Sequence, residues 1–140
     1  MAPRVPRELQ FQHSHHYGAQ SASGIAIPVR LTASGKSVRL LAKLDTGADF
    51  CIFERVYGEQ LGLNIDSARP ALFRTANGEF QAFGHEVTIT CFDWQFDSVV
   101  FFPATIEIRR NVLGRQGWLQ RFRVALVDCD SVLHLSHYNE

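Results

Sequence analysis

The chain has 140 residues, of which 46% are hydrophobic and 20% are charged, and this composition is typical of one packed globular domain. The 14 Lys and Arg residues balance the 14 Asp and Glu residues, which argues against a nucleic-acid-binding protein because such proteins usually carry a basic excess. The longest apolar run, residues 99–104, is far shorter than the ~20 residues of a membrane-spanning helix. We therefore expect neither nucleic acid nor a membrane as a partner.

The first 23 residues differ in composition from the rest of the chain. They contain two prolines, a histidine cluster and a small polar tract, and they lack the apolar segment of a secretory signal. We predict a flexible N-terminal arm, residues 1–23, followed by one domain, residues 24–140, in the cytoplasm. His13, His15 and His16 are of a type that binds transition metals, but a mobile polar arm is the simpler interpretation and no metal is expected.

The three cysteines, Cys51, Cys91 and Cys129, are widely spaced and odd in number. Neither a disulfide framework nor a zinc site follows from that spacing. Buried free thiols are predicted instead, as is usual in a reducing compartment.

Apolar residues that alternate with polar ones predict short strands. Residues 25–31 and 38–44 form the two arms of a first hairpin, which ends next to Asp45. The continuous apolar run at residues 50–53 predicts a strand buried on both faces. A short helix is predicted over residues 54–61, because Gly62 provides a stop.

A second hairpin is predicted over residues 72–83, with Asn77 and Gly78 at its centre, because both residues tolerate positive φ. Further strands are predicted at residues 86–92, 96–102, 112–114, 124–127 and 132–135, with a helical turn at 116–122. Eight or nine short strands with little helix predict an all-β domain with a closed, barrel-like sheet and one or two short helices.

The segment Asp45-Thr46-Gly47 places a carboxylate at the end of an alternating strand. Gly47 has no Cβ, so a neighbouring backbone or a substrate can approach the loop closely. The Thr46 hydroxyl can bond a backbone group and brace the loop. Taken alone, the tripeptide would also suit an Asx-type turn without any chemical function.

Three features, in one order, resemble the retropepsin-like aspartic proteases, the single-domain family that includes the retroviral proteases. Residues 44–49 (Leu-Asp-Thr-Gly-Ala-Asp) resemble the catalytic loop after its hairpin, and the turn at residues 76–79 falls where the family carries its flap. Residues 111–115 (Asn-Val-Leu-Gly-Arg) resemble the second hydrophobic-hydrophobic-glycine signature. The resemblance covers residues 24–127, and it implies an acid-protease fold that forms one half of a pepsin-like two-fold assembly.

This resemblance implies a homodimeric aspartic endopeptidase that cuts extended peptides or proteins without a metal or other cofactor. The chain contains one Asp-Thr-Gly, so the catalytic pair is expected to combine Asp45 from two subunits. Two close carboxylates share one proton and can therefore act as both base and acid. The C-terminal hairpin, residues 124–135, is the expected interface, because terminal strands pair between subunits in the family.

The family pattern also implies roles for the residues around the motif. The Asp-Thr-Gly residues would be catalytic, and Thr46 would bond the loop of the partner subunit. Asp49 and Arg115 would form a buried ion pair that, with Gly114, supports the loop. An aromatic residue at position 50 would favour apolar substrate side chains. The residues expected to contact the substrate are Ala48, Asp49, Phe50, Ala76, Asn77, Gly78 and Glu79.

Two alternatives remain open at the level of the sequence. In the first, the same fold forms a non-catalytic dimer that binds peptides or regulates a partner, and Asp-Thr-Gly has a structural role. In the second, the residues before Gly24 are a propeptide that the enzyme removes by cleaving itself.

Overall fold

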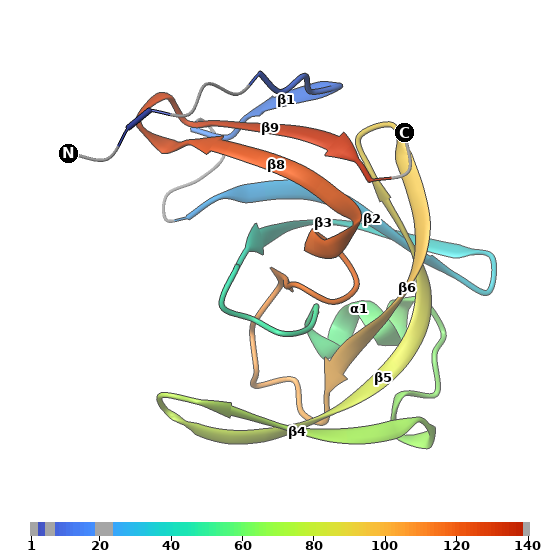
Figure 1. Cartoon of the computed structure of the whole chain (residues 1–140). Coiled ribbons are helices and arrows are strands. Elements are labelled where there is room, and N and C mark those ends of the chain that lie inside the picture. Colours follow the sequence, from blue (N-terminus) through green and yellow to red (C-terminus); the bar gives the residue numbers. More distant parts are fainter. Residues whose placement is uncertain (1–2, 5–7, 19–23, 139–140) are drawn as a thin grey trace.

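The computed structural model describes residues 3–4, 8–18 and 24–138, and β-strands dominate this part of the chain (Figure 1). The strands are β1 (His13–His16), β2 (Ala26–Ala33), β3 (Lys36–Leu44), β4 (Arg69–Thr75), β5 (Gly78–Cys91), β6 (Trp94–Pro103), β7 (Val112–Leu113), β8 (Phe122–Val127) and β9 (Val132–His137). The helical segments are α1 (Arg55–Gln60) and the 3₁₀ helices η1 (Ile65–Ser67), η2 (Leu119–Arg121) and η3 (Asp128–Asp130).

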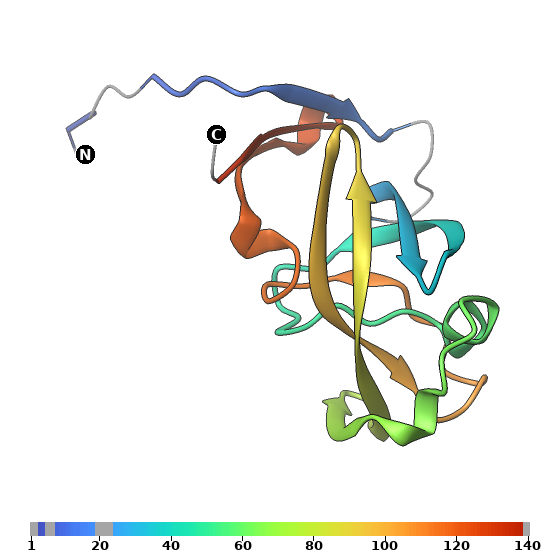
Figure 2. The same ribbon diagram turned by 90° about the vertical axis from the view of Figure 1, so that its right-hand side faces the viewer.

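Six strands form the larger sheet, in the order β4-β5-β2-β3-β7, with β6 also paired to β5. β5 joins the sheet together because its first half pairs with β4 and its second half with β2, while β6 follows it along residues 82–91. In Figure 2, β5 and β6 run as one long ribbon pair from the upper end of the molecule to the β4–β5 hairpin. The hairpin therefore lies at one end of a long, continuously paired ribbon.

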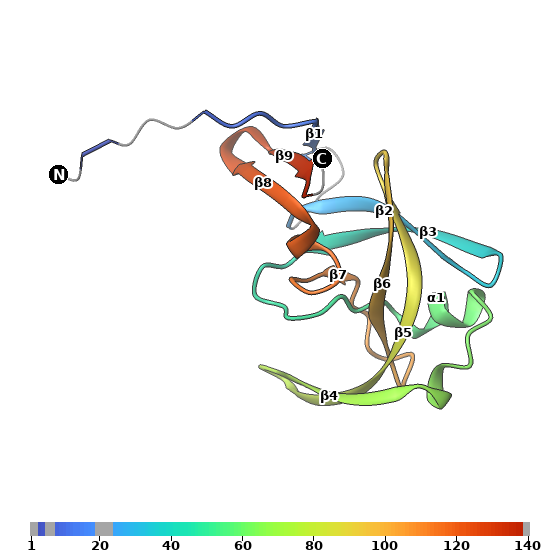
Figure 3. The ribbon, with the colours of Figure 1, turned by 45° about the vertical axis from the view of Figure 1, so that its right-hand side comes forward.

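The smaller sheet has three antiparallel strands in the order β1-β9-β8. It lies at the opposite end of the molecule from the β4–β5 hairpin (Figure 3). Side chains from this sheet, including Leu133, Leu135 and Tyr17 beside it, join the core that the larger sheet builds around Ile27 and Leu31. The two sheets thus share one hydrophobic core.

The prediction of a flexible arm is wrong for residues 13–16. These residues form β1, which pairs with β9 from His13 opposite Leu135 to His16 opposite Val132. His15 is buried, and its Nε2 lies 2.8 Å from the carbonyl oxygen of Ala26, so that nitrogen donates a hydrogen bond to the larger sheet. The rest of the predicted arm includes residues 1–2, 5–7 and 19–23, which lie outside the described residues.

The predicted all-β class is confirmed, but the expectation of a closed sheet is wrong, because the strands form two open sheets. The apolar run at residues 50–53 makes only isolated bridges, in which Ile52 pairs with Phe101 on one side and Val112 on the other. At the second hairpin, Thr75 pairs with Gly78, and only Gly78 has a positive φ, of 127°. The turn is therefore centred one residue earlier than predicted, on Ala76 and Asn77.

The core contains two of the three cysteines. Cys51 and Cys91 are buried free thiols, as predicted, whereas Cys129 is exposed in η3. The largest fully buried side chains are those of Trp118, Phe53 and Phe102. Among the described residues, no helix has the length and apolar character needed to cross a membrane.

Candidate active site

Asp45 follows β3 directly, and two neighbouring segments fix its backbone. β7 runs parallel to the end of β3, and the Asp45 N–H donates a 3.0 Å hydrogen bond to the carbonyl oxygen of Leu113. The chain then turns, because the Ala48 N–H donates to the Asp45 carbonyl oxygen at 3.1 Å. The Gly47 N–H donates to Oδ1 of the Asp45 carboxylate at 2.9 Å. The loop thus presents a carboxylate that its own backbone orients.

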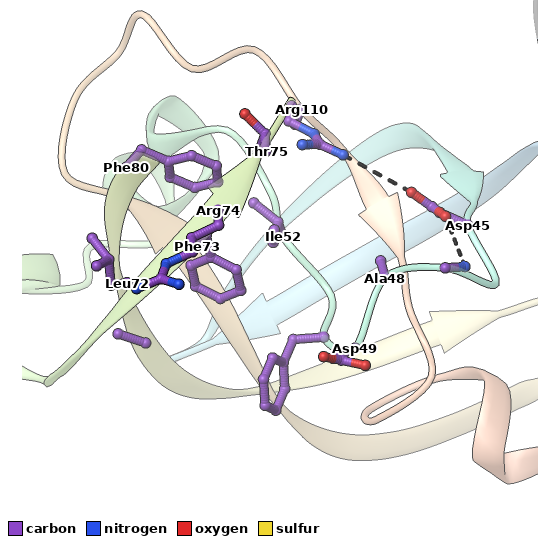
Figure 4. Close-up of a pocket in the computed structure, with 13 residues that line it drawn as sticks. Asp45, Ala48, Asp49, Ile52, Leu72, Phe73, Arg74, Thr75, Phe80 and Arg110 are labelled. Carbon is purple, nitrogen blue, oxygen red and sulfur yellow. Dashed lines mark hydrogen bonds and ion pairs between the residues drawn. The ribbon is translucent and has the colours of Figure 1, made fainter. Parts of the chain in front are cut away.

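The Asp45 carboxylate faces a second charged group, the guanidinium of Arg110. Arg110 Nη2 lies 3.9 Å from Asp45 Oδ2, and Figure 4 shows the two side chains pointing toward one another. The side chains are 39% and 38% exposed, respectively, so solvent screens this attraction. Sequence reasoning missed Arg110, because it lies 65 positions further along the chain and belongs to no motif that the sequence shows.

Gly114 lies where the Asp45 loop crosses the segment after β7. A Cβ at position 114 would lie 2.3 Å from the Phe50 carbonyl oxygen and 2.8 Å from that of Ala48. Two backbone hydrogen bonds hold this crossing together, from the Arg115 N–H to Ala48 O at 2.9 Å and from the Gln116 N–H to Asp49 O at 2.8 Å. Only glycine lets the two backbones approach so closely.

The predicted buried ion pair between Asp49 and Arg115 is wrong. Both residues are exposed, and the ion pairs found within the described ranges do not include this one. Backbone hydrogen bonds join the two segments, and the side chains of both residues are exposed to solvent, where an ion pair gains little.

A cavity of about 560 Å³ lies between the Asp45 loop and the β4–β5 hairpin. Figure 4 shows Asp45 and Ala48 on one side of it and Phe73, Arg74 and Thr75 on the other. The lining consists of Asp45, Gly47, Ala48, Asp49, Phe50, Ile52, Ala71, Leu72, Phe73, Arg74, Thr75, Phe80 and Arg110. The motif carboxylate and an adjacent apolar surface thus share one space.

Not every residue predicted for the site reaches this cavity. Five of the predicted residues line it: Asp45, Gly47, Ala48, Asp49 and Phe50. Thr46 is exposed and lies outside the lining. The predicted tip residues of the hairpin, 76–79, also lie outside it, and the preceding residues 71–75 take their place together with Phe80. Phe73 and Phe80 are cross-strand partners on either side of the turn at Ala76 and Asn77, and that aromatic pair was a usable sequence signal.

Four phenylalanines connect the hairpin to the loop. The rings of Phe73 and Phe80 stack at 5.4 Å between centroids, and Phe73 meets Phe50 and Phe101 edge-on at 6.1 Å and 5.2 Å. Such aromatic pairs contribute about 0.5–1.5 kcal/mol each beyond the burial of their area. The hairpin is therefore positioned over the Asp45 loop by contacts within the subunit.

Cys51 lies next to the loop but is not a nucleophile. Burial raises the pKa of its thiol to about 11, although a hydrogen bond with the Gly114 backbone and the charge of Arg121 act in the opposite direction. The thiol therefore stays protonated at neutral pH, and its Sγ lies 3.7 Å from the Gln116 carbonyl oxygen. The carboxylates that line the cavity are those of Asp45 and Asp49.

Comparison with known proteins gives matches in structure only. No protein-family model matches the chain, and no curated protein matches its sequence. A retropepsin-like aspartic protease from Rickettsia conorii superposes with a TM-score of 0.57 at 18% identity, covering 78% of this chain and 88% of that one. The EIAV protease in complex with the inhibitor HBY-793 superposes with a TM-score of 0.52 at 19% identity, covering 69% of this chain and 86% of that one. The fold of this chain is retropepsin-like.

Proposed function

We propose that this retropepsin-like chain is an aspartic endopeptidase that acts as a homodimer, with one Asp45 from each subunit in a shared catalytic pair. The observation that carries the proposal is the position of Asp45, which a backbone-braced loop presents to a cavity under the β4–β5 hairpin. The sequence contains one Asp-Thr-Gly, so a second carboxylate of this kind has to come from a second subunit.

The chemistry follows from the proximity of two carboxylates. Like charges a few ångströms apart do not both ionise, so the pair holds one proton at acidic pH. The ionised carboxylate accepts a proton from a bound water as that water attacks the peptide carbonyl carbon. The protonated carboxyl donates its proton to the carbonyl oxygen, which gives a tetrahedral diol. As the C–N bond breaks, the leaving nitrogen takes the proton that the first carboxylate removed from water, and one hydroxyl of the diol returns a proton to the other carboxylate. Activity is therefore expected to be greatest at acidic pH.

The hairpin would act as the flap over the substrate. β4 ends the larger sheet and pairs only with β5 within the described part, so its outer edge has backbone groups available to an extended peptide. Phe73 and Phe80 would exclude water from the site and contact apolar side chains of the substrate. The proposed substrates are extended polypeptides with apolar residues beside the cleaved bond.

Replacing Asp45 with Asn tests the proposal directly. Because Asn cannot share the proton, Asp45→Asn should lower the cleavage rate of a peptide library at least about a thousandfold at every pH between 3 and 8. The half-exposed side chain makes few contacts, so the variant should keep the wild-type circular dichroism spectrum and mass in solution. Asp93→Asn, the same change in an exposed turn, should leave cleavage unchanged. Full activity in the Asp45 variant would end the proposal.

One observation favours the non-catalytic alternative. The Asp45 carboxylate already faces Arg110 within its own subunit, and such a pair suits a structural carboxylate in a peptide-binding dimer. That alternative predicts that the wild-type protein forms a stable dimer and binds peptides in the cavity. It also predicts that no peptide is cleaved at any pH.

A further inference from the structure

A second cavity, of about 730 Å³, adjoins the cavity of the candidate active site. The two cavities share Phe50 and Ala71 in their linings, so they meet along β4. The second cavity is lined by Phe50, Arg69, Ala71, Gly84, Ser98, Val99, Phe101, Gln116, Gly117 and Arg121. Its position extends the space available to a bound peptide beyond Phe50.

Two arginines make this second cavity positively charged. Arg69 and Arg121 line it, and no Asp or Glu belongs to its described lining. Neither arginine takes part in an ion pair within the described residues. This contrasts with the first cavity, where Arg74 pairs with Glu79 at 3.1 Å and Arg110 faces Asp45. The two positive charges of the second cavity therefore have no ion-pair partner within the described residues, in a chain whose net charge is zero.

Arg121 is held in place but is not saturated with hydrogen bonds. Its guanidinium carbon lies 4.7 Å from the ring centroid of Phe96, and its Nη2 donates to the carbonyl oxygen of Asp97. Its Nε is buried without a hydrogen-bond partner among the described residues. A buried donor without a partner on a fixed cation is costly, so the hydrogen-bonding capacity of this guanidinium is not fully used within the described residues.

Two carboxylates belong to residues that neighbour this lining on β5 and β6, and neither forms an ion pair with Arg69 or Arg121 among the described residues. The Asp97 carboxylate accepts a hydrogen bond from Thr88 at 2.7 Å. Glu86 is the cross-strand partner of Val99 and shares its face of the sheet, but it is exposed and outside the lining. Both arginines therefore have no carboxylate in an ion pair with them among the described residues.

We propose that this second cavity is a subsite that binds an acidic side chain, Glu or Asp, of the peptide substrate. The inference rests on the proposed function, because it requires an extended peptide in the first cavity. The strand β4 runs past both cavities, with Thr75 at the first and Arg69 at the second. Six residue steps span about 20 Å, so the acidic residue would lie three to six positions from the cleaved bond. A symmetric dimer would carry one such subsite on each side of that bond.

The test uses peptides in which one Glu is moved through positions two to six on either side of the cleaved bond, each compared with the matching Gln peptide. At the preferred position, the wild-type kcat/KM should be roughly tenfold higher for Glu than for Gln, and salt should reduce this ratio. Arg69→Gln should bring the ratio to about one. Arg39→Gln, which removes an exposed positive charge outside both cavities, should leave it unchanged.

Binding to the Asp45→Asn variant separates this proposal from the peptidase itself. Fluorescence anisotropy with labelled Glu and Gln peptides should show the same preference without any cleavage, and the added Arg69→Gln change should remove it. Equal cleavage of Glu and Gln peptides at all positions would overturn the subsite and leave the peptidase standing. Preferential binding of the Glu peptide without wild-type cleavage would support the subsite and overturn the peptidase. Absence of both cleavage and binding would overturn both.

Discussion

Gly114 shows how a single residue far from the motif determines the shape of the Asp45 loop. Its missing side chain lets the Phe50 and Ala48 carbonyl oxygens approach the backbone at the crossing beneath the site. Those oxygens belong to the loop segment that also lines the cavity. The geometry around the carboxylate therefore depends on a residue 69 positions away in the sequence.

Gly114→Ala should destabilise the whole fold. A methyl group 2.3 Å from a backbone oxygen forces two backbone segments apart, and we expect a loss of roughly 3 kcal/mol in the free energy of unfolding. Gly47→Ala is the comparison, because its Cβ would meet only the movable Asp45 carboxylate, at 3.3 Å, and should cost less than about 1 kcal/mol. Urea denaturation measures both values. Equal losses would show that the crossing is not the rigid contact described.

Residues adjacent in sequence were predicted better than residues that meet only in space. The Asp-Thr-Gly motif was identified because apolar and polar residues alternate in the strand before it and because its three residues are contiguous. Arg110 was missed because the fold alone brings it to Asp45. The Asp49–Arg115 pair was wrong because the sequence does not reveal that both side chains are exposed where their segments meet.

Among the elements, the predicted hairpins were confirmed and β1 was not anticipated. Hairpins such as β2–β3 combine local alternation with a turn, so nearby residues carry all the information. β1 contains histidines and a serine in place of an apolar pattern, and its partner β9 lies about 120 residues away. The side chain of β1 that faces the core is that of His15, and its ring centroid lies 5.2 Å from the ring centroid of Phe92.

His15→Ala tests whether β1 belongs to the folded unit. The variant loses the hydrogen bond to Ala26 and the buried ring, so we expect the free energy of unfolding to fall by about 1–3 kcal/mol. His16→Ala, on the outward face of the same strand, should change it by less than about 0.5 kcal/mol. Thermal or urea denaturation provides the comparison. If the two variants unfold alike, β1 contributes nothing to stability.

At the scale of the whole molecule, β8 is an outer strand of the smaller sheet. β9 lies between β1 and β8, and each of these two outer strands pairs with β9 alone within the described ranges. Leu126 and Val127 on β8 are 48% and 36% exposed. These features support the prediction that the C-terminal hairpin pairs with a second subunit, because an unpaired strand edge is a template for a further strand.

Mixing wild-type and Asp45→Asn subunits measures whether catalysis belongs to the dimer. After co-refolding from urea at equal amounts and constant total concentration, about one quarter of the dimers contain two wild-type subunits. A mixed pair of one Asp and one Asn lacks a group to accept or donate the second proton, so it should be inactive. Total activity should therefore fall to about one quarter of the wild-type value. A fall to one half would mean that each subunit cleaves peptides independently, and the shared catalytic pair would then be wrong.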